Sequence, residues 1–305
     1  MREDFCSGFR VRCAACYSAT MATGKKPSVA IVGMGRLGSA LLRHLARTGY
    51  VINEIVVRDR PESRRKAHKH AGARIHVSTY DAARLDADLI WFCVPDAEIA
   101  NIGDALASKA HWKGKLAFHS SGALAANELR LLQRKGAKVA SVHPFTSFVH
   151  AAIPSLRGVP FGLEGDRAAL VQARRIVKDL GGIAFTIPRA RKTAYHAWGS
   201  FTSPLLIALL VTAEEVAEAA GVAPALARKR MLPILEQTLQ NYANLGAAGS
   251  FSGPIVRGDV ETVRRHIAAL ERLPEAQKVY VALATAALKR LPLENNRKLK
   301  SVLRS

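Results

Sequence analysis

Two basic side chains near the middle of the chain have the spacing of residues that act together. Lys192 and His196 are four residues apart in a segment with helical composition, so we expect them on one helical face. A lysine or histidine can supply the proton needed where negative charge develops, as in reduction of a C=O or C=N bond. The pair is therefore a candidate for acid–base catalysis. The alternative is a solvated lysine beside a packed histidine.

Polar residues also follow two predicted strands, at the point where each strand ends. His119, Ser120 and Ser121 follow one apolar stretch, and His143 followed by Pro144 ends the next. Open α/β sheets bind ligands outside the carboxyl ends of their strands. We therefore predict that His119, Ser120, Ser121 and His143 contact a substrate, with ordinary structural turns as the alternative.

A single arginine stands in a turn-rich segment of the second half. Arg257 lies in the stretch 253–259, between two predicted helices. Its guanidinium group could bind a substrate carboxylate or phosphate with two parallel hydrogen bonds. The segment has a purely structural explanation as well, because Asp259 is a suitable N-cap for the next helix.

A glycine-rich loop between a strand and a helix is the most specific motif of the chain. The pattern G-x-G-x-x-G in a βαβ unit binds the pyrophosphate of a dinucleotide, through close backbone approach and the N–H groups of the helix N-terminus. Val94 and Pro95, which end a neighbouring strand, are assigned to the same cofactor site. The loop residues are Gly33, Met34, Gly35, Arg36, Leu37 and Gly38.

Residues after the second strand bear on the choice between NADP and NAD. Asp59 lies 21 residues after Gly38, near the position of an acidic side chain that would bind the ribose hydroxyls of NAD. Arg58 and Arg60 flank it, Ser63, Arg64 and Arg65 follow just beyond, and such an arginine cluster favours the additional 2′-phosphate of NADP. We predict NADP, with NAD as the alternative.

These residues imply an α/β fold for the first half of the chain. Strands alternate with helices, which predicts βαβ units and a Rossmann-type, mostly parallel sheet with helices on both faces. Strands are predicted at 28–33, 51–57, 88–94, 115–119, 137–142, 159–163 and 183–187, and helices at 39–48 and 167–180.

The second half has only helical patterns. Helices are predicted at 192–220, 224–245, 259–273 and 276–291, so we expect a flexible extension over 1–26, a dinucleotide-binding domain over 27–188 and an all-α domain over 189–305. Pro204 should kink the first of these helices. Their apolar side chains exceed the needs of one small bundle, which predicts a homodimer; the most apolar stretch holds Leu205, Leu206, Ile207, Leu209, Leu210 and Val211.

From about residue 29 to 288 the chain resembles a family of uncharacterised Rossmann-like proteins with a helical C-terminal domain of unknown function. The motifs are VAIVGMGRLGSAL, FCVPDAEI, HSSGAL, SVHPFTSF, GVPFGLEGD, KTAYHAWGSF and GPIVRGDVETVRRH. The wider group includes pyrroline-5-carboxylate, ketopantoate, 6-phosphogluconate, 3-hydroxyisobutyrate and prephenate oxidoreductases.

The resemblance implies an all-α domain like that of 6-phosphogluconate dehydrogenase, which supplies substrate contacts and often the dimer interface. It implies a catalytic role for Lys192, with His196 in place of an asparagine four residues further on. His143 and Pro144 resemble the His-Pro pair of prephenate dehydrogenases. One departure is Pro204, which stands where the family pattern has an asparagine, so a polar contact through that residue is lost.

Composition limits the function classes. The net charge of +21 raises the question of nucleic acid, but the basic residues are scattered and not interleaved with aromatics, so we expect anionic small molecules instead. Cys13 and Cys16 lack the partners of a zinc site, so no metal is predicted. The apolar run 204–212 is shorter than a membrane span. We expect a cytoplasmic protein without a membrane partner.

Together these features predict an NADP-dependent oxidoreductase that transfers a hydride between the nicotinamide and the C=O or C=N carbon of a small anionic metabolite. The surplus of titratable groups favours turnover. The alternative is a non-catalytic NADP-binding scaffold or regulatory protein, because no complete catalytic constellation of a named enzyme is present.

Overall fold

The computed structural model describes residues 25–72, 74–149, 154–290 and 297–304. The extension 1–24 with Cys13 and Cys16 lies outside the described residues. The chain forms two compact units, the first through Tyr195 and the second from His196. This division falls seven residues after the domain boundary predicted at 188/189, because the first turn of helix α6 packs against the sheet. We call the two parts the sheet unit and the helical unit.

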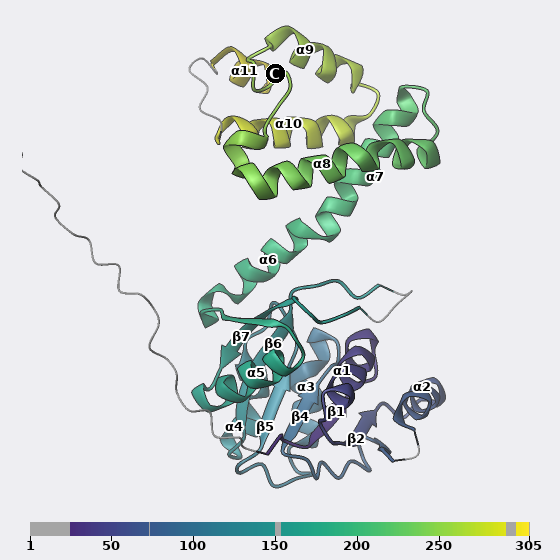
Figure 1. Ribbon diagram of the computed structural model, residues 1–305, viewed down its shortest axis with the longest axis vertical. Helices are drawn as coiled ribbons and strands as arrows, with labels where there is room; N and C mark the ends of the chain where they lie inside the picture. Colours follow the sequence, from purple (N-terminus) through teal and green to yellow (C-terminus); the bar gives the residue numbers. More distant parts are fainter. Residues whose placement is uncertain (1–24, 73, 150–153, 291–296, 305) are drawn as a thin grey trace, which may run out of the picture. The chain divides into compact units, whose positions relative to one another are not determined.

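The sheet unit contains one eight-stranded sheet (Figure 1). Its order is β3-β2-β1-β4-β5-β6-β7-β8, and all neighbours are parallel except β6 and β7. The first six strands have the Rossmann order, which reverses between β1 and β4. The strands are β1 Val29–Val32, β2 Ile52–Val57, β3 His76–Thr79, β4 Leu89–Phe92, β5 Leu116–His119, β6 Lys138–Pro144, β7 Pro160–Gly165 and β8 Ile183–Thr186.

Helices cover both faces of this sheet, as its apolar strands require. The helices α1 (Arg36–Arg47) and α5 (Arg167–Asp179) pack on one face, in a core with Ile31 and Trp91. The helix α3 (Ile99–Leu106) packs on the other face, in a second core with Phe92. Further elements are α2 Pro61–Ala71, η1 Asp96–Glu98, η2 Ala126–Leu129, α4 Arg130–Arg134 and η3 Arg189–Arg191.

The predicted α/β class is confirmed, with differences in detail. The sequence pattern missed β3, α2, α3 and α4. The first two contain few apolar residues, so neither strand nor helix periodicity stands out in them. Strand β6 also continues past the predicted end at residue 142. His143 pairs with Gly162 on the antiparallel neighbour β7, which extends the hydrogen-bonded ladder and places His143 inside the strand.

The helical unit is all-α, as predicted. The long helix predicted at 192–220 is interrupted at Ser203, whose φ of −134° and ψ of −82° are not helical, directly before Pro204. The helix α8 continues beyond the predicted end at residue 245, across a kink at Gly246 with φ +69°. The helices of this half of the chain are α6 Lys192–Thr202, whose first turn belongs to the sheet unit, α7 Pro204–Ala219, α8 Pro224–Ser250, α9 Val260–Ala269, α10 Pro274–Leu288 and α11 Arg297–Val302.

One helical stretch is longer than the apolar run seen in the sequence. The segment Arg189–Ala219, 31 residues with its interruption, is long and apolar enough to cross a membrane, and only 6% of its most apolar part is buried. Length therefore does not exclude a span here as it does for the run 204–212. Mostly buried core helices of soluble proteins also meet this criterion of length and composition, so one such helix is weak evidence for a span.

Candidate functional site

The glycine loop lies at the end of β1 in close contact with the end of β4. Gly33 has φ +98°, and a Cβ added to it would lie 2.6 Å from the Cys93 carbonyl oxygen. A Cβ on Gly38 would lie 2.1 Å from the Gly33 carbonyl oxygen. Gly35 is the N-cap of α1 and no side chain caps this terminus, so its backbone N–H groups are available to an anion. The loop thus has the geometry that its glycines predict.

A cavity of about 360 Å³ adjoins this loop. Seven of the residues predicted to bind the cofactor line it: Gly33, Met34, Gly35, Arg58, Arg60, Val94 and Pro95. Ser63, which the sequence analysis named beside the arginines, also lines it, and five further lining residues were not predicted: Val57, Glu62, Lys66, Tyr80 and Cys93. Ser63 and Lys66 come from the first turns of α2, a helix that periodicity did not reveal, and Tyr80 follows the unpredicted strand β3.

Basic side chains and one acidic side chain, Glu62, line this cavity, whereas Asp59 lies beside it. Arg58 and Arg60 line the cavity, and so does Tyr80. Asp59 is not a lining residue; its carboxylate forms an ion pair with Arg64, with Oδ1 and Nη2 2.5 Å apart. The side chain expected to select NAD is therefore held by an arginine away from the cavity.

The other predicted cofactor residues lie beside the cavity without lining it. Arg36 donates from Nη1 to the Phe148 carbonyl oxygen at 3.0 Å. Leu37 packs against the core of the sheet unit, and Gly38 lies against Gly33. Arg64 lines a separate, smaller cavity with Ser78 and other residues near β3.

A network of buried polar groups continues from the cavity along the carboxyl ends of β4, β5 and β6. Pro95 lines the cavity, and the next residue, Asp96, accepts a hydrogen bond from Ser121 Oγ at 2.6 Å. The Ser121 carbonyl oxygen accepts from Ser141 Oγ at 2.9 Å and from Lys192 Nζ at 2.9 Å. Lys192 also donates to Ser141 Oγ at 2.7 Å. The structure thus brings together predicted residues from two strand ends and one helix.

Lys192 lies at the centre of this network. Its side chain is 2% exposed, and burial lowers the pKa of its amino group to about 8, although Glu164 and Asp96 nearby favour the charged form. A pKa close to neutrality suits a group that exchanges protons during catalysis. Its hydrogen bonds also hold the backbone that follows β5.

His119 and Ser120 are fixed by hydrogen bonds. His119 has no exposed surface; its Nε2 donates to the Ala125 carbonyl oxygen at 3.0 Å, and its Nδ1 accepts from the Ser121 backbone N–H at 3.2 Å. Burial lowers the pKa of His119 to about 4, so the ring stays neutral. Ser120 accepts a hydrogen bond from Trp91 Nε1 at 2.8 Å. His119 can reach a ligand only if these bonds break, so its observed contacts shape the loop.

His143 forms a close pair with a residue that the sequence analysis did not select. Its Nδ1 lies 2.7 Å from the Tyr195 phenol oxygen, and the two rings meet edge-on with centroids 5.5 Å apart. Tyr195 lies against Gly162 of β7, where an added Cβ would lie 2.7 Å from the phenol. The only signals in the sequence were its position three residues after Lys192 and the glycine in β7.

His196 and Arg257 belong to the helical unit. Both side chains are exposed, His196 on α6 and Arg257 in the turn before α9. Asp259 caps α9 by accepting from the Thr262 backbone N–H at 3.0 Å, which is the structural role foreseen for this turn. Their roles as catalytic and substrate-binding residues stay predictions.

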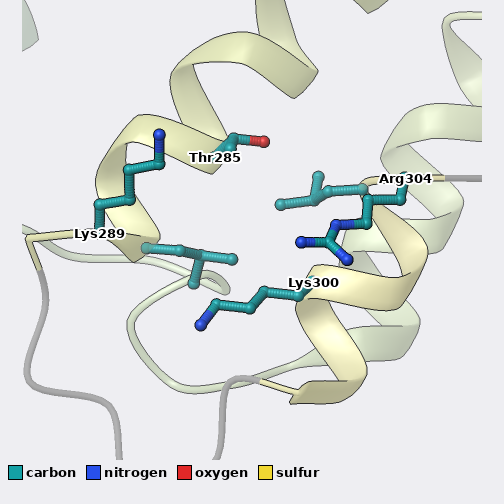
Figure 2. A pocket seen from close by; sticks show the side chains of 6 residues that line it. Thr285, Lys289, Lys300 and Arg304 are labelled. Atoms are coloured by element: carbon teal, nitrogen blue, oxygen red, sulfur yellow. The ribbon is translucent and has the colours of Figure 1, made fainter.

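A cavity of about 90 Å³ in the helical unit gathers basic side chains (Figure 2). Thr285 and Lys289 come from the end of α10, and Lys300 and Arg304 come from α11 and the residues after it. None of the sequence-predicted site residues lines this cavity. Within the described residues, no group of three or more His, Cys, Asp or Glu side chains is placed to hold a metal ion.

Two family models match the chain. A Rossmann-like domain matches residues 18–144, and the Domain of unknown function (DUF2520) matches residues 159–287. The second match begins inside the sheet unit, at β7. No curated protein matches the sequence.

Solved structures share the fold over most of the chain. A putative NADP oxidoreductase from Bacteroides fragilis is 18% identical, with a TM-score of 0.70, 86% of this chain covered and 98% of that one. An imine reductase from Myxococcus stipitatus in complex with NADP+ is 17% identical, with a TM-score of 0.64 and coverage of 86% and 93%. A reductive aminase from Aspergillus terreus in complex with NADPH and ethyl-5-oxohexanoate is 17% identical, with a TM-score of 0.62 and coverage of 87% and 95%. At these identities the likeness establishes the fold.

Proposed function

We propose that this chain, in which a Rossmann-like domain is followed by a DUF2520 domain, is an NADP-dependent oxidoreductase. It would transfer a hydride between the nicotinamide and the C=O or C=N carbon of a small anionic metabolite. The three similar structures support this proposal, because two contain NADPH or NADP+ and all are named as oxidoreductases, reductases or aminases.

The basic wall of the 360 Å³ cavity is the observation that carries the proposal. Four side chains with donors, Arg58, Arg60, Ser63 and Lys66, line it and outnumber its one carboxylate, Glu62, while Asp59 pairs with Arg64 outside it. A 2′-phosphate needs several charged donors, whereas the ribose hydroxyls of NAD need a carboxylate in reach. The arrangement favours NADP.

The remaining cofactor contacts follow from the glycine loop. The N-terminus of α1, capped only by Gly35, would bind the pyrophosphate through backbone N–H groups. NADPH supplies the hydride, and the chain must supply a proton to the substrate oxygen or nitrogen. Lys192 is our candidate for this proton transfer, with His196 as the second candidate. We assign Ser120, Ser121 and His143 to the substrate side, and Arg257 to an anionic group of the substrate.

We also propose a homodimer formed through the helical unit. The helices α7 and α8 expose large apolar side chains that a folded protein normally covers. They include Leu205, Ile207 and Val211 on α7, and Leu232, Ile234, Leu239, Tyr242 and Leu245 on α8. A cytoplasmic location without a membrane partner fits this proposal, because a second copy would then cover the apolar helices.

The cofactor assignment is tested by removing one arginine at a time. Arg58→Ala and Arg60→Ala should each raise the Kd for NADPH about 30-fold, since one charge-assisted contact contributes about 2 kcal/mol, and should leave NADH binding unchanged. Arg65→Ala is the matched control, because Arg65 is exposed on α2 but does not line the cavity. Equal losses for NADPH and NADH would contradict a 2′-phosphate site.

The acid–base assignment is tested by turnover. Lys192→Met should lower kcat at least 100-fold while NADPH affinity stays within about twofold, because proton transfer contributes about 10²–10⁴ in rate. The substrates to screen are keto acids, imines and hydroxy acids, followed by the absorbance of NADPH. If the unmodified protein binds NADPH but turns over none of them, the non-catalytic scaffold is the better account.

A further inference from the structure

The Tyr195 phenol and His143 Nδ1 share a hydrogen bond of 2.7 Å, whose direction depends on the tautomer of the histidine. A hydrogen bond from the Gly162 backbone lowers the pKa of Tyr195 in part, which is the effect of an N–H donor at the phenol oxygen. Burial outweighs it and raises this pKa to about 12, so the phenol keeps its proton. A phenol that keeps its hydrogen can donate it to His143 Nδ1, 2.7 Å away.

The ring nitrogens of a neutral histidine have opposite roles. When Nδ1 accepts a hydrogen bond, the proton resides on Nε2, which is then a donor. His143 is partly exposed, and its strand lies beside β5, whose carboxyl end carries Ser120 and Ser121. A donor at this edge suits the oxygen of a C=O group or the nitrogen of a C=N group.

We propose that Tyr195 is a positioning residue: it fixes the tautomer of His143 so that Nε2–H donates to the oxygen or nitrogen of the bond being reduced. The assignment of Nε2–H to a substrate rests on the proposed function, but the tautomer itself does not. Lys192 would supply the proton, while His143 would orient and polarise the reacting bond.

The surroundings hold the tyrosine in place. The rings of Phe145 and Phe185 lie 5.6 and 5.9 Å from its own centroid, and the Lys192 ammonium lies 5.6 Å from it. Gly162 leaves the space for the phenol, because an added Cβ would overlap it. A tyrosine packed from several sides can direct its hydroxyl at one acceptor, as a positioning residue must.

The helical unit contains a second pair that serves as a control. Tyr280 and His266 have nearly the same geometry, with the phenol oxygen 3.0 Å from Nδ1 and the rings edge-on at 5.8 Å. His266 is exposed, and it is none of the predicted site residues. Tyr280→Phe therefore removes the same kind of hydrogen bond away from the site.

The test is the protonation of the imidazole nitrogens, observed by NMR in protein labelled with ¹⁵N-histidine, without cofactor, at pH 8 where ordinary imidazoles are neutral. His143→Asn identifies its signal among the 10 histidines. We expect His143 as the Nε2–H tautomer alone in the unmodified protein and as a mixture in Tyr195→Phe. Tyr280→Phe should change only His266. A proton on Nδ1 in the unmodified protein, or a single unchanged tautomer in a folded Tyr195→Phe, would overturn the proposal.

Kinetics distinguish this proposal from the function on which it rests. Tyr195→Phe should lower kcat about tenfold with the KM for NADPH unchanged, whereas Tyr280→Phe should leave kcat unchanged. If NADPH does not bind, the proposed function fails while the tautomer result still stands. If the tautomer changes but kcat does not, Tyr195 fixes His143 but His143 does not contact the reacting bond, and the catalytic half of the proposal is wrong.

Discussion

The sheet unit and the helical unit bury their side chains in opposite ways. The sheet unit encloses both faces of its strands and also buries charged and polar groups such as Lys192, His119 and Glu54. In the described residues every buried side-chain nitrogen or oxygen has a hydrogen-bond partner. In the helical unit, α7 buries only Glu214. The hydrophobic core of this unit consists of five buried residues: Val263, Ala284, Leu288, Leu299 and Leu303.

This difference indicates different roles for the two units. Buried, bonded polar groups hold loops and side chains in one arrangement, which a catalytic site requires. Exposed leucines and isoleucines contribute to stability only when another surface covers them. Under the proposed function, the buried polar groups of the sheet unit would hold a site for cofactor and substrate, and a second copy would cover the exposed apolar side chains of the helical unit. The experiments below test this contrast, beginning with the largest expected effect.

Replacing a glycine of the glycine loop should destabilise the protein far more than replacing a glycine of the helical unit. Gly38→Ala should cost about 3 kcal/mol or more of unfolding free energy and abolish NADPH binding, because the new Cβ would overlap the Gly33 carbonyl oxygen. Gly258→Ala, at φ +70° with no atom within 4 Å of the Cβ, should cost about 1 kcal/mol. Urea unfolding and NADPH titration check both. Equal losses of unfolding free energy for the two variants would contradict the contrast between the sheet unit and the helical unit.

Replacing an exposed apolar residue should weaken dimerisation only when the residue lies in the helical unit. Ile234 on α8 is 67% exposed and Ile183 on the edge strand β8 is 60% exposed. Ile234→Glu should raise the dimer dissociation constant about 100-fold, because an unpaired charge would be buried in the interface. Ile183→Glu should leave it unchanged. Light scattering over a range of concentrations measures both. A monomeric mass for the unmodified protein at micromolar concentration would remove the proposed homodimer.

The sheet unit should be the more sensitive to acid, because it buries a neutral histidine. The pKa of His119 is about 4 when folded and 6.5 when unfolded, so below pH 6.5 the unfolded state takes up a proton that the folded state does not. The contribution of neutral His119 to the free energy of unfolding is complete above pH 6.5. It is lost as the pH falls to about 4, and the total loss is about 3 kcal/mol.

The fluorescence of Trp91 and Trp112, both buried in the sheet unit, reports this loss in urea unfolding at pH 7 and pH 4.5. His119→Gln should flatten the pH dependence between these values, and His266→Gln, at an exposed position of α9, should not. A pH dependence that persists undiminished in His119→Gln would assign the acid sensitivity to other groups.

The glycine loop, the strands and the change to an all-α second half could be predicted, because local patterns determine them. The selection of Arg58 and Arg60 also came from local sequence. By contrast, α2 with Ser63 and Lys66 has too few apolar residues to show a period, and only the fold shows that Arg64 removes Asp59 from the cavity. Tyr195 was missed for a similar reason: its partner His143 is 52 residues away and meets it only across β6 and α6.

The central claim is that the basic wall of the cavity beside the glycine loop selects NADP. Calorimetric titration of the purified protein with NADPH, and separately with NADH, tests it most directly. We predict that NADPH binds at least about 30-fold more tightly, which corresponds to about 2 kcal/mol for the contacts to one phosphate. Equal affinities would show that Arg58 and Arg60 do not bind a 2′-phosphate, and binding of neither nucleotide would contradict the oxidoreductase proposal as a whole.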